Sequence, residues 1–326
     1  MYLRQEITRF CIPKPGQGDI VNVTSTDSTM KQQIQAVIDL TRAHFFFVWP
    51  LLFCSGLLLA FHTYGGFSID LLLRAVFIGL FGFLAGLVLN DYVDRDIDRK
   101  DVDASLTRYW RPFHERPIVE GKIAPATALG IFFLLAAAAA VLILTLPYPN
   151  SLYVLVIMVY SYASEYFYQV KKRNQSIPIA QLVGRTDFAL FPVAGYLAFG
   201  SPDVTALLYF LFFYPWTLAH LGVNDMADIV NDRARGLATI PVLYGMKGAS
   251  LWMLFFTAAH LVFALVFAWT IDPMLLLGFI PGFVLIALAN YLVVKRPDAR
   301  SALRALPLLH ASLLVYAIAI IVVAVL

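Results

Sequence analysis

The chain has little charge and almost no cysteine. Only 14% of its 326 residues are charged, while 60% are hydrophobic and the mean hydropathy is +0.75. A soluble domain carries about 25% charged and about 45–50% apolar residues, so this chain has too little polar surface to cover a globule in water. The composition excludes a soluble enzyme and a disordered chain, and it indicates a polytopic membrane protein. Two cysteines, Cys11 and Cys54, cannot form a disulfide framework, and a net charge of +3 gives no support for a nucleic-acid partner.

The N-terminal segment contrasts with the rest of the chain. Residues 1–40 are polar and contain no apolar run of the kind found in a signal peptide, so we expect a cytoplasmic tail that ends in a short interfacial helix around Gln32–Arg42. Beyond this tail, no polar or Gly/Ser-rich stretch divides the chain. We therefore expect residues 41–326 to form one membrane domain.

Long apolar runs make up most of this domain. A helix needs about 20 mostly apolar residues to cross a bilayer, and prolines in or near several runs are compatible with kinked membrane helices. The predicted fold is all-α, with nine transmembrane helices in a single bundle around a central cavity. The nine apolar stretches are residues 44–62, 71–91, 125–146, 150–168, 178–199, 204–225, 250–271, 274–294 and 304–325.

Basic residues distinguish the two sides of the predicted bundle. The first, third, fifth and seventh breaks between apolar stretches contain no lysine or arginine. The chain has 24 basic residues, and 22 of them lie in the N-terminal segment or around the other breaks. The two exceptions are Arg74 and Arg185. Because cytoplasmic loops are enriched in Lys and Arg, we expect the N-terminus and the even-numbered breaks in the cytoplasm, and the C-terminus outside.

Two acidic motifs share one spacing. Residues 90–98 read NDYVDRDID and residues 224–232 read NDMADIVND, and both fit N-D-x-x-D-x-x-x-D. They occur at the expected cytoplasmic ends of the second and sixth helices. The return of the same spacing after four helices indicates an internal repeat.

Helical geometry gives this spacing a chemical meaning. Asn90, Asp94 and Asp98 are at i, i+4 and i+8, and the aspartates of the second motif are at i, i+3 and i+7, so each set shares one helix face. Clustered carboxylates repel one another, and removing them from water is costly, so a cation is needed. Mg²⁺ prefers oxygen ligands and usually bridges carboxylates to phosphates. Two facing motifs therefore predict a diphosphate site bridged by Mg²⁺; the alternative is a solvated acidic cap at two helix ends.

Four sequence blocks, in the right order, resemble the UbiA superfamily of intramembrane prenyltransferases. They are the two acidic motifs, the stretch RPIVEGKI at residues 116–123 and the stretch GLATIPVLYG at residues 236–245. The resemblance covers nearly the whole chain. It implies an integral protein of the cell (plasma) membrane whose active site faces the cytoplasm and transfers prenyl groups.

The resemblance also implies the reaction partners. These are Mg²⁺ as cofactor, an isoprenyl diphosphate donor, a hydrophobic or aromatic acceptor and the lipid bilayer, with no nucleic acid and no obligate protein partner. The second motif is most similar to that of ether-lipid and chlorophyll-type relatives, which favours quinone or archaeal-type ether-lipid biosynthesis. Neither the donor chain length, the acceptor nor the oligomeric state follows from the residues.

The resemblance assigns roles to individual residues. Asp94, Asp98, Asp228 and Asp232 are expected to carry the catalysis by holding the metal against the diphosphate. The expected metal ligands are Asn90, Asp91, Asp94, Asp98, Asp225, Asp228 and Asp232, although Asp91 could instead orient a base or a cap. The expected diphosphate and substrate contacts are Asn90, Asn224, Arg116, Lys122, Lys171, Lys172, Tyr168 and Arg185.

Several of these residues also have a structural interpretation. The basic candidates could be surface charges that set the topology, and Tyr168 could belong to an interfacial aromatic belt instead of facing an allylic cation. Arg185 could pair with Asp187. His220 could line the cavity or be a packing histidine, and Arg42 could meet an anionic acceptor or be an interfacial anchor.

Two features depart from the family pattern. The segment Arg99–Glu115 is longer than in many relatives and could reshape a lid over the site. Ala238 stands where relatives often have lysine, so a cationic contact expected there must be absent or supplied by another residue.

Two other functions stay open. A membrane CDP-alcohol phosphotransferase also uses clustered aspartates and a metal, but the D-G-x-x-A-R stretch of that class does not occur in the sequence. A divalent cation transporter would carry ionisable groups near the membrane midplane, whereas the carboxylates here are expected at helix ends on one side.

Overall fold

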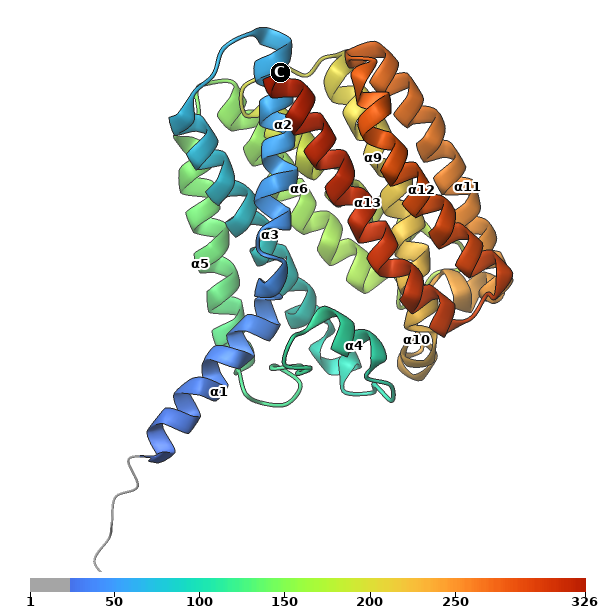
Figure 1. The fold of residues 1–326 in the computed structure, drawn as a ribbon. Helices are drawn as coiled ribbons and strands as arrows, with labels where there is room; N and C mark the ends of the chain where they lie inside the picture. The colour runs from blue at the N-terminus through green and yellow to red at the C-terminus, as the bar shows by residue number, and fades with distance from the viewer. Residues whose placement is uncertain (1–23) are drawn as a thin grey trace, which may run out of the picture.

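The computed structural model describes residues 24–326 as a bundle of helices, with no strand in that range. The long helices run side by side, and α1, α4 and α10 lie at the same end of the bundle (Figure 1). Most of the tail expected over residues 1–40 lies outside the described residues. The elements are α1 (Thr24–Thr41), the 3-10 helix η1 (Ala43–Phe45), α2 (Val48–Tyr64), α3 (Ile69–Asp98), α4 (Ser105–Trp110), α5 (Pro125–Leu144), α6 (Asn150–Lys171), α7 (Ile179–Gly184), α8 (Thr186–Leu197), α9 (Val204–Ala227), α10 (Ile229–Arg235), α11 (Ile240–Ile271), α12 (Met274–Lys295) and α13 (Ala299–Val325).

Seven of the described helices are long and apolar enough to cross a membrane. They correspond to seven of the nine predicted stretches, and the all-helical membrane fold is confirmed. The seven are Ala43–Tyr64, Ile69–Asp98, Pro125–Leu144, Val204–Ala227, Ile240–Ile271, Met274–Lys295 and Ala299–Val325.

The remaining two predicted stretches do not meet the same criteria for length and hydropathy. Residues 150–168 lie in α6, which has 22 residues but carries Glu165, Gln169 and Lys171 near its end. Residues 178–199 form two short helices, α7 and α8, which meet at Arg185. Both departures occur where the chain borders the cavity described below, so polar side chains interrupt the apolar pattern there.

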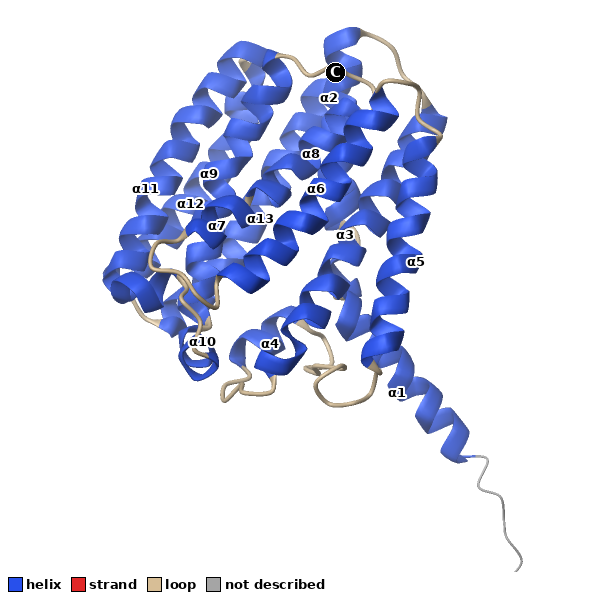
Figure 2. Ribbon diagram, turned by 180° about the vertical axis from the view of Figure 1, so that it is seen from behind, coloured by secondary structure: helices blue, strands red, loops and turns tan. Residues whose placement is uncertain are grey.

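The helices α7 and α8 are labelled in Figure 2, and side-chain hydroxyls of neighbouring helices stabilise the break between them. Tyr214 and Thr217 of α9 donate hydrogen bonds to the carbonyl oxygens of Leu182 and Arg185, at 2.8 and 3.2 Å. Ser164 of α6 donates to a third carbonyl of α7, at 3.0 Å. Backbone carbonyls freed inside a membrane helix need such partners, so the neighbouring helices make the break possible.

Glycines allow α2 and α8 to cross at close range. A Cβ atom at Gly56 of α2 would collide with the carbonyl oxygen of Pro192, and one at Gly195 of α8 would collide with the carbonyl oxygen of Phe53. Small residues at helix crossings let two backbones approach closely in membranes. This crossing packs the first half of the bundle together and forms part of its apolar core.

Replacing Gly195 by alanine is expected to destabilise the protein by about 1–3 kcal/mol, because the added methyl group overpacks the crossing. The measurement is the midpoint of thermal unfolding of the detergent-solubilised protein. Gly130→Ala is the matched control, since a Cβ at that position of α5 meets no atom within 4 Å. Equal midpoints for the two variants would show that the crossing tolerates a side chain.

Candidate active site

The first acidic motif lies in the last turns of α3. This helix continues past residue 91, the end of the predicted span, and finishes at Asp98. Asn90, Asp94 and Asp98 share the face of α3 that lines a polar cavity of about 1160 Å³. Asp96 points away from it, with 66% of its side chain exposed.

The second acidic motif bends around the same cavity. Asn224 and Asp225 lie in the last turn of α9, Asp228 caps that helix with φ −100° and ψ 9°, and Asp232 follows in α10. Gly236 ends α10 in the left-handed conformation, with φ 73°, which suits glycine. All four motif residues line the cavity opposite α3.

The turn after α10 brings a hydroxyl back to the second motif. Thr239 Oγ1 donates a hydrogen bond to Asp232 Oδ2 at 2.7 Å. Burial, followed by the nearby charges of Asp225 and Asp228, raises the pKa of the Asp232 carboxyl well above its ordinary value. A cation in the cavity would counter this shift by favouring the ionised form.

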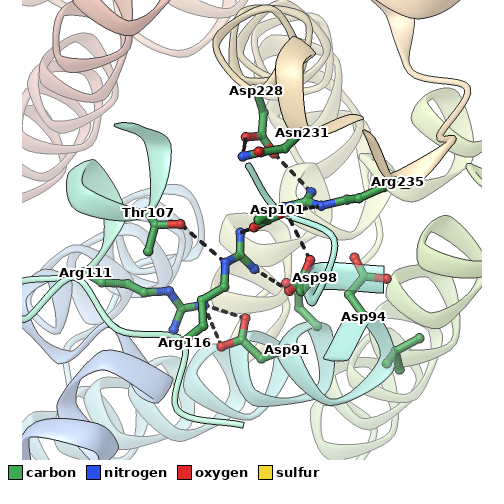
Figure 3. Close-up of polar contacts among 12 residues, drawn as sticks. Asp91, Asp94, Asp98, Asp101, Thr107, Arg111, Arg116, Asp228, Asn231 and Arg235 are labelled. Atoms are coloured by element: carbon green, nitrogen blue, oxygen red, sulfur yellow. Dashed lines mark hydrogen bonds and ion pairs between the residues drawn. The ribbon is translucent and has the colours of Figure 1, made fainter. Parts of the chain in front are cut away.

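Two arginines form ion pairs with motif carboxylates, and one of them, Arg235, connects the two motifs (Figure 3). Arg235 of α10, with 5% of its side chain exposed, lies 3.1 Å from Asp228, 3.8 Å from Asp232 and 3.4 Å from Asp98. Arg116 forms an ion pair with Asp98 and lies 2.8 Å from Asp101. The arginines therefore neutralise carboxylates of both motifs together.

A lysine neutralises Asp94 of the first motif. Lys172 Nζ lies 2.6 Å from Asp94 Oδ2, and both side chains are buried. The backbone N–H of Ala238 donates to the carbonyl oxygen of Lys172 at 2.8 Å. The backbone of Lys172 thus lies directly beside position 238, where a family lysine is missing.

Aromatic and cationic groups form the wall of the cavity next to Lys172. The Tyr168 ring centroid lies 4.9 Å from Lys172 Nζ and 5.3 Å from the guanidinium carbon of Arg185. On the opposite side, Trp110 Nε1 donates a hydrogen bond of 3.2 Å to Asn224 Oδ1. Each of these residues lines the cavity.

Three of the predicted site residues do not line this cavity. Asp91 is buried between Arg111 and Arg42, at 2.7 and 3.1 Å. Lys122 is partly exposed and pairs with two glutamates of its own loop, and the hydrogen bond to Glu115 raises the pKa of its ammonium group. Lys171 is half-buried at the end of α6. The structure therefore separates Asp91, Lys122 and Lys171 from the other predicted residues.

The donor set suits Mg²⁺ completed by phosphate. Within residues 30–326, no three acidic, histidine or cysteine side chains converge to form a metal site by themselves. Mg²⁺ in proteins is usually held by one or two carboxylates together with substrate phosphates and water. Asp225 has a buried Oδ2 atom with no hydrogen-bond partner among the described residues. An unpartnered carboxylate oxygen beside a polar cavity is the expected donor for such an ion.

An apolar chamber adjoins the polar cavity. It has a volume of about 900 Å³ and lies between α2, α3, α5, α6 and α8. Six residues line both spaces, so the chamber begins where the polar cavity ends; the shared residues are Arg42, Phe83, Leu87, Asn90, Arg185 and Phe188. An apolar chain with a charged head group fits this arrangement.

Sequence reasoning missed several groups of the site. Arg235 and Arg111 were assigned only to the cytoplasmic side, because positive loop charges already explained them. Asp101 lies in the long segment after the first motif and pairs with Arg235 at 2.5 Å. One available signal was the position of Arg235, one helical turn after Asp232.

The profile of the UbiA prenyltransferase family matches residues 47–324. The chain belongs to the UbiA prenyltransferase family. The resemblance seen in the four sequence blocks is therefore confirmed.

Curated relatives within the UbiA family match part of their own length. The chain is 29% identical to protoheme IX farnesyltransferase of Aquifex aeolicus over 53% of this chain and 55% of the relative. It is 34% identical to digeranylgeranylglyceryl phosphate synthase of Methanothermobacter thermautotrophicus over 50% of this chain and 52% of the relative. The chain thus spans about half the length of these curated relatives.

Solved UbiA structures share the fold. A UbiA homologue from Aeropyrum pernix K1 superposes with a TM-score of 0.66 at 20% identity, over 86% of this chain and 96% of the homologue. A UbiA homologue from Archaeoglobus fulgidus, bound to DMAPP and Mg²⁺, superposes with a TM-score of 0.54 at 15% identity, over 88% and 99%. At these identities the likeness establishes the fold.

Proposed function

We propose that this chain is a Mg²⁺-dependent prenyltransferase, which moves a prenyl group from an isoprenyl diphosphate to a hydrophobic or aromatic acceptor in the membrane. The observation that carries the proposal is the junction of two spaces. A cavity lined by both acidic motifs opens into an apolar chamber of about 900 Å³. The diphosphate would occupy the first space and the prenyl chain the second.

The two motifs supply the oxygen ligands for the metal. The residues that would hold Mg²⁺ are Asn90, Asp94 and Asp98 of the first motif and Asp225, Asp228 and Asp232 of the second. When bound, Mg²⁺ would offset the negative charge that develops on the leaving diphosphate. The A. fulgidus homologue bound to DMAPP and Mg²⁺ supports this assignment.

Basic side chains of the cavity would bind the diphosphate oxygens. Arg116 and Arg235 lie between the motifs, and Lys172 lies beside Asp94. Lys172 would supply the contact that relatives obtain from the lysine at position 238. Arg185 lines the boundary with the chamber, and Tyr168 lines the polar cavity beside Arg185. There the Tyr168 ring would face the allylic carbon and attract its positive charge.

The chamber would exclude water from the reacting carbon. Its wall is made mainly of aliphatic and aromatic side chains of α3, α6 and α8, including Phe83, Phe188 and Phe191. Water at an allylic cation would yield the free alcohol, so a dry chamber protects transfer to the acceptor.

We further propose that the chain crosses the membrane nine times and that the polar cavity faces the cytoplasm. α6 and the pair α7–α8 would complete the seven spans that meet the criteria for length and hydropathy. Hydrogen bonds from α6 and α9 at the Arg185 break are compatible with a crossing there. Lysine and arginine are concentrated at the end of the bundle that holds the polar cavity, which supports a cytoplasmic N-terminus. We also propose that residues 1–40 form a tail and that residues 41–326 form one plasma-membrane domain.

The acceptor class that we favour is a quinone precursor or an archaeal-type ether lipid. The form of the second acidic motif supports this choice, as does the match to digeranylgeranylglyceryl phosphate synthase. The match to protoheme IX farnesyltransferase makes haem the competing acceptor.

The test is pyrophosphate release by the purified protein in detergent. Dimethylallyl, geranyl, farnesyl and geranylgeranyl diphosphates are each supplied with Mg²⁺, alone and with 4-hydroxybenzoate, 1,4-dihydroxy-2-naphthoate, protohaem IX or geranylgeranylglyceryl phosphate. We expect release that requires one acceptor and stops in EDTA. No release from any donor contradicts the proposal, and Mg²⁺ flux into proteoliposomes without release would identify a transporter.

A further inference from the structure

Two histidines form a hydrogen-bonded pair at the edge of the polar cavity. His220 of α9 and His310 of α13 approach with their Nε2 atoms 2.8 Å apart. Trp216 stacks on His220, with ring centroids 5.2 Å apart and planes 7° apart, and Trp110 packs its ring 5.0 Å from His310. The pair therefore lies in an aromatic enclosure that holds both rings in place.

The pair connects the cavity to a more exposed position. His220 lines the polar cavity, and on the other side Tyr109 Oη lies 2.5 Å from His310 Nδ1. Tyr109 is half-buried on α4, within the long segment that follows the first acidic motif. Three groups that can each accept and donate a proton thus stand in series from the cavity to the outer surface of α4.

We propose that His220, His310 and Tyr109 form a histidine relay that carries the acceptor's proton out of the cavity. This inference rests on the proposed prenyl transfer. Transfer forms a bond between the acceptor and the allylic carbon while the carbon–oxygen bond to the diphosphate breaks, and the electron pair of that bond leaves with the diphosphate. The acceptor then has one proton to lose, and the relay removes it without any further reactant.

The relay operates by successive transfers along the hydrogen bonds. His220 takes the proton on Nδ1 and passes the Nε2 proton to Nε2 of His310. His310 passes its Nδ1 proton to Tyr109, whose hydroxyl proton goes to water at the surface. Each ring gains one proton and loses one, so no charge stays on the pair.

Neighbouring charges favour this passage over storage of the proton. Arg42 lies over the Trp110 ring, 5.8 Å from its centroid, and Arg185 lines the same cavity as His220. A resident imidazolium would be repelled by both guanidinium groups. Asp94, Asp98, Asp228 and Asp232 are already paired with Arg116, Arg235 and Lys172. Asp225 is a proposed metal ligand, so the histidine pair is the basic group of the cavity that is left to take up a proton.

The test compares variants that cut the relay with one that does not. Tyr109→Phe removes the last hydroxyl but keeps the ring, and His310→Ala removes the middle group. Because proton transfer by a positioned group typically contributes about 100-fold or more, we expect each variant to lower kcat by about 100-fold. The KM for the prenyl diphosphate that the wild-type protein uses should stay unchanged. Tyr291→Phe is the matched control, because Tyr291 is exposed on α12 and contacts Lys295.

Chemical rescue separates a relay from mere packing. Imidazole added to His310→Ala should restore transfer, since it can accept from His220 and donate to Tyr109. 1-Methylimidazole fills the same space but has no N–H to pass on, so it should not restore transfer. Equal rescue by both compounds, or full activity in Tyr109→Phe and His310→Ala, overturns the relay and leaves the transferase standing. A wild-type protein that transfers no prenyl group from any of the four donors to any of the four acceptors overturns the proposed function and the relay together.

Discussion

Asp225→Asn is expected to reduce Mg²⁺-dependent pyrophosphate release by about 100- to 1000-fold, the range seen when one preorganised electrostatic contact to a transition state is lost. Asp225 is buried in the cavity wall, and its Oδ2 atom has no hydrogen-bond partner among the described residues. Asparagine has the same shape but no charge, so the change removes a metal ligand without breaking an ion pair. The rate is measured at saturating Mg²⁺ with the donor and acceptor that the wild-type protein uses.

Asp96→Asn is the matched control for this variant. Asp96 belongs to the first acidic motif, but its side chain is 66% exposed, and among the described residues it pairs only with Arg95 and Arg99, at 3.7 and 3.8 Å. We expect its rate to stay within a factor of about 2, as expected for an exposed ion pair worth at most about 1 kcal/mol. If Asp225→Asn and Asp96→Asn release pyrophosphate at the same rate, Asp225 does not bind the metal. The thermal unfolding midpoint of Asp225→Asn should not fall below that of the wild type.

Arg235→Gln is expected to destabilise the protein by about 3–5 kcal/mol in EDTA, because removing one partner of a buried ion pair leaves uncompensated charge. Arg235 contacts Asp98, Asp101, Asp228 and Asp232, and only 5% of its side chain is exposed. Thermal unfolding in detergent measures the loss. Added Mg²⁺ should recover part of it, since a bound cation replaces the missing positive charge between the motifs.

Arg233→Gln serves as the comparison for the arginine variant. Arg233 lies two residues earlier in α10 and is exposed. We expect its midpoint to match that of the wild type, with and without Mg²⁺. A loss of stability in Arg235→Gln that Mg²⁺ leaves unchanged would mean that the arginine supports the packing of α10 and does not balance the shared carboxylates.

Much of the fold could be predicted because most spans face lipid or an apolar core. Long apolar runs such as residues 71–91 and 304–325 can be identified as membrane spans from hydropathy alone. The prediction was least accurate over residues 178–199, where the chain forms α7 and α8 with a break at Arg185, which lines both the polar cavity and the apolar chamber. A pattern that detects only apolar surface cannot locate such a break.

The candidate site could be predicted in part. The spacing of the two acidic motifs identified one helix face in α3, and the structure directs both motifs toward a single cavity. The spacing could not show that Asp91 is buried between Arg42 and Arg111. These arginines are 49 and 20 residues away from Asp91 in the sequence, and only the fold brings them together. Arg235 was overlooked for a related reason: loop arginines look alike in sequence, and only the folded chain distinguishes a topological charge from a buried counterion.

The break between α7 and α8 has a mechanical consequence. An interrupted helix usually bends where its own hydrogen bonds are missing, but here hydroxyls of α6 and α9 bind two carbonyls of α7 and the carbonyl of Arg185 at the gap. These bonds fasten α6 and α9 to the interrupted helix. The interruption is therefore a braced joint and not a hinge, and it holds Arg185 where the polar cavity meets the apolar chamber.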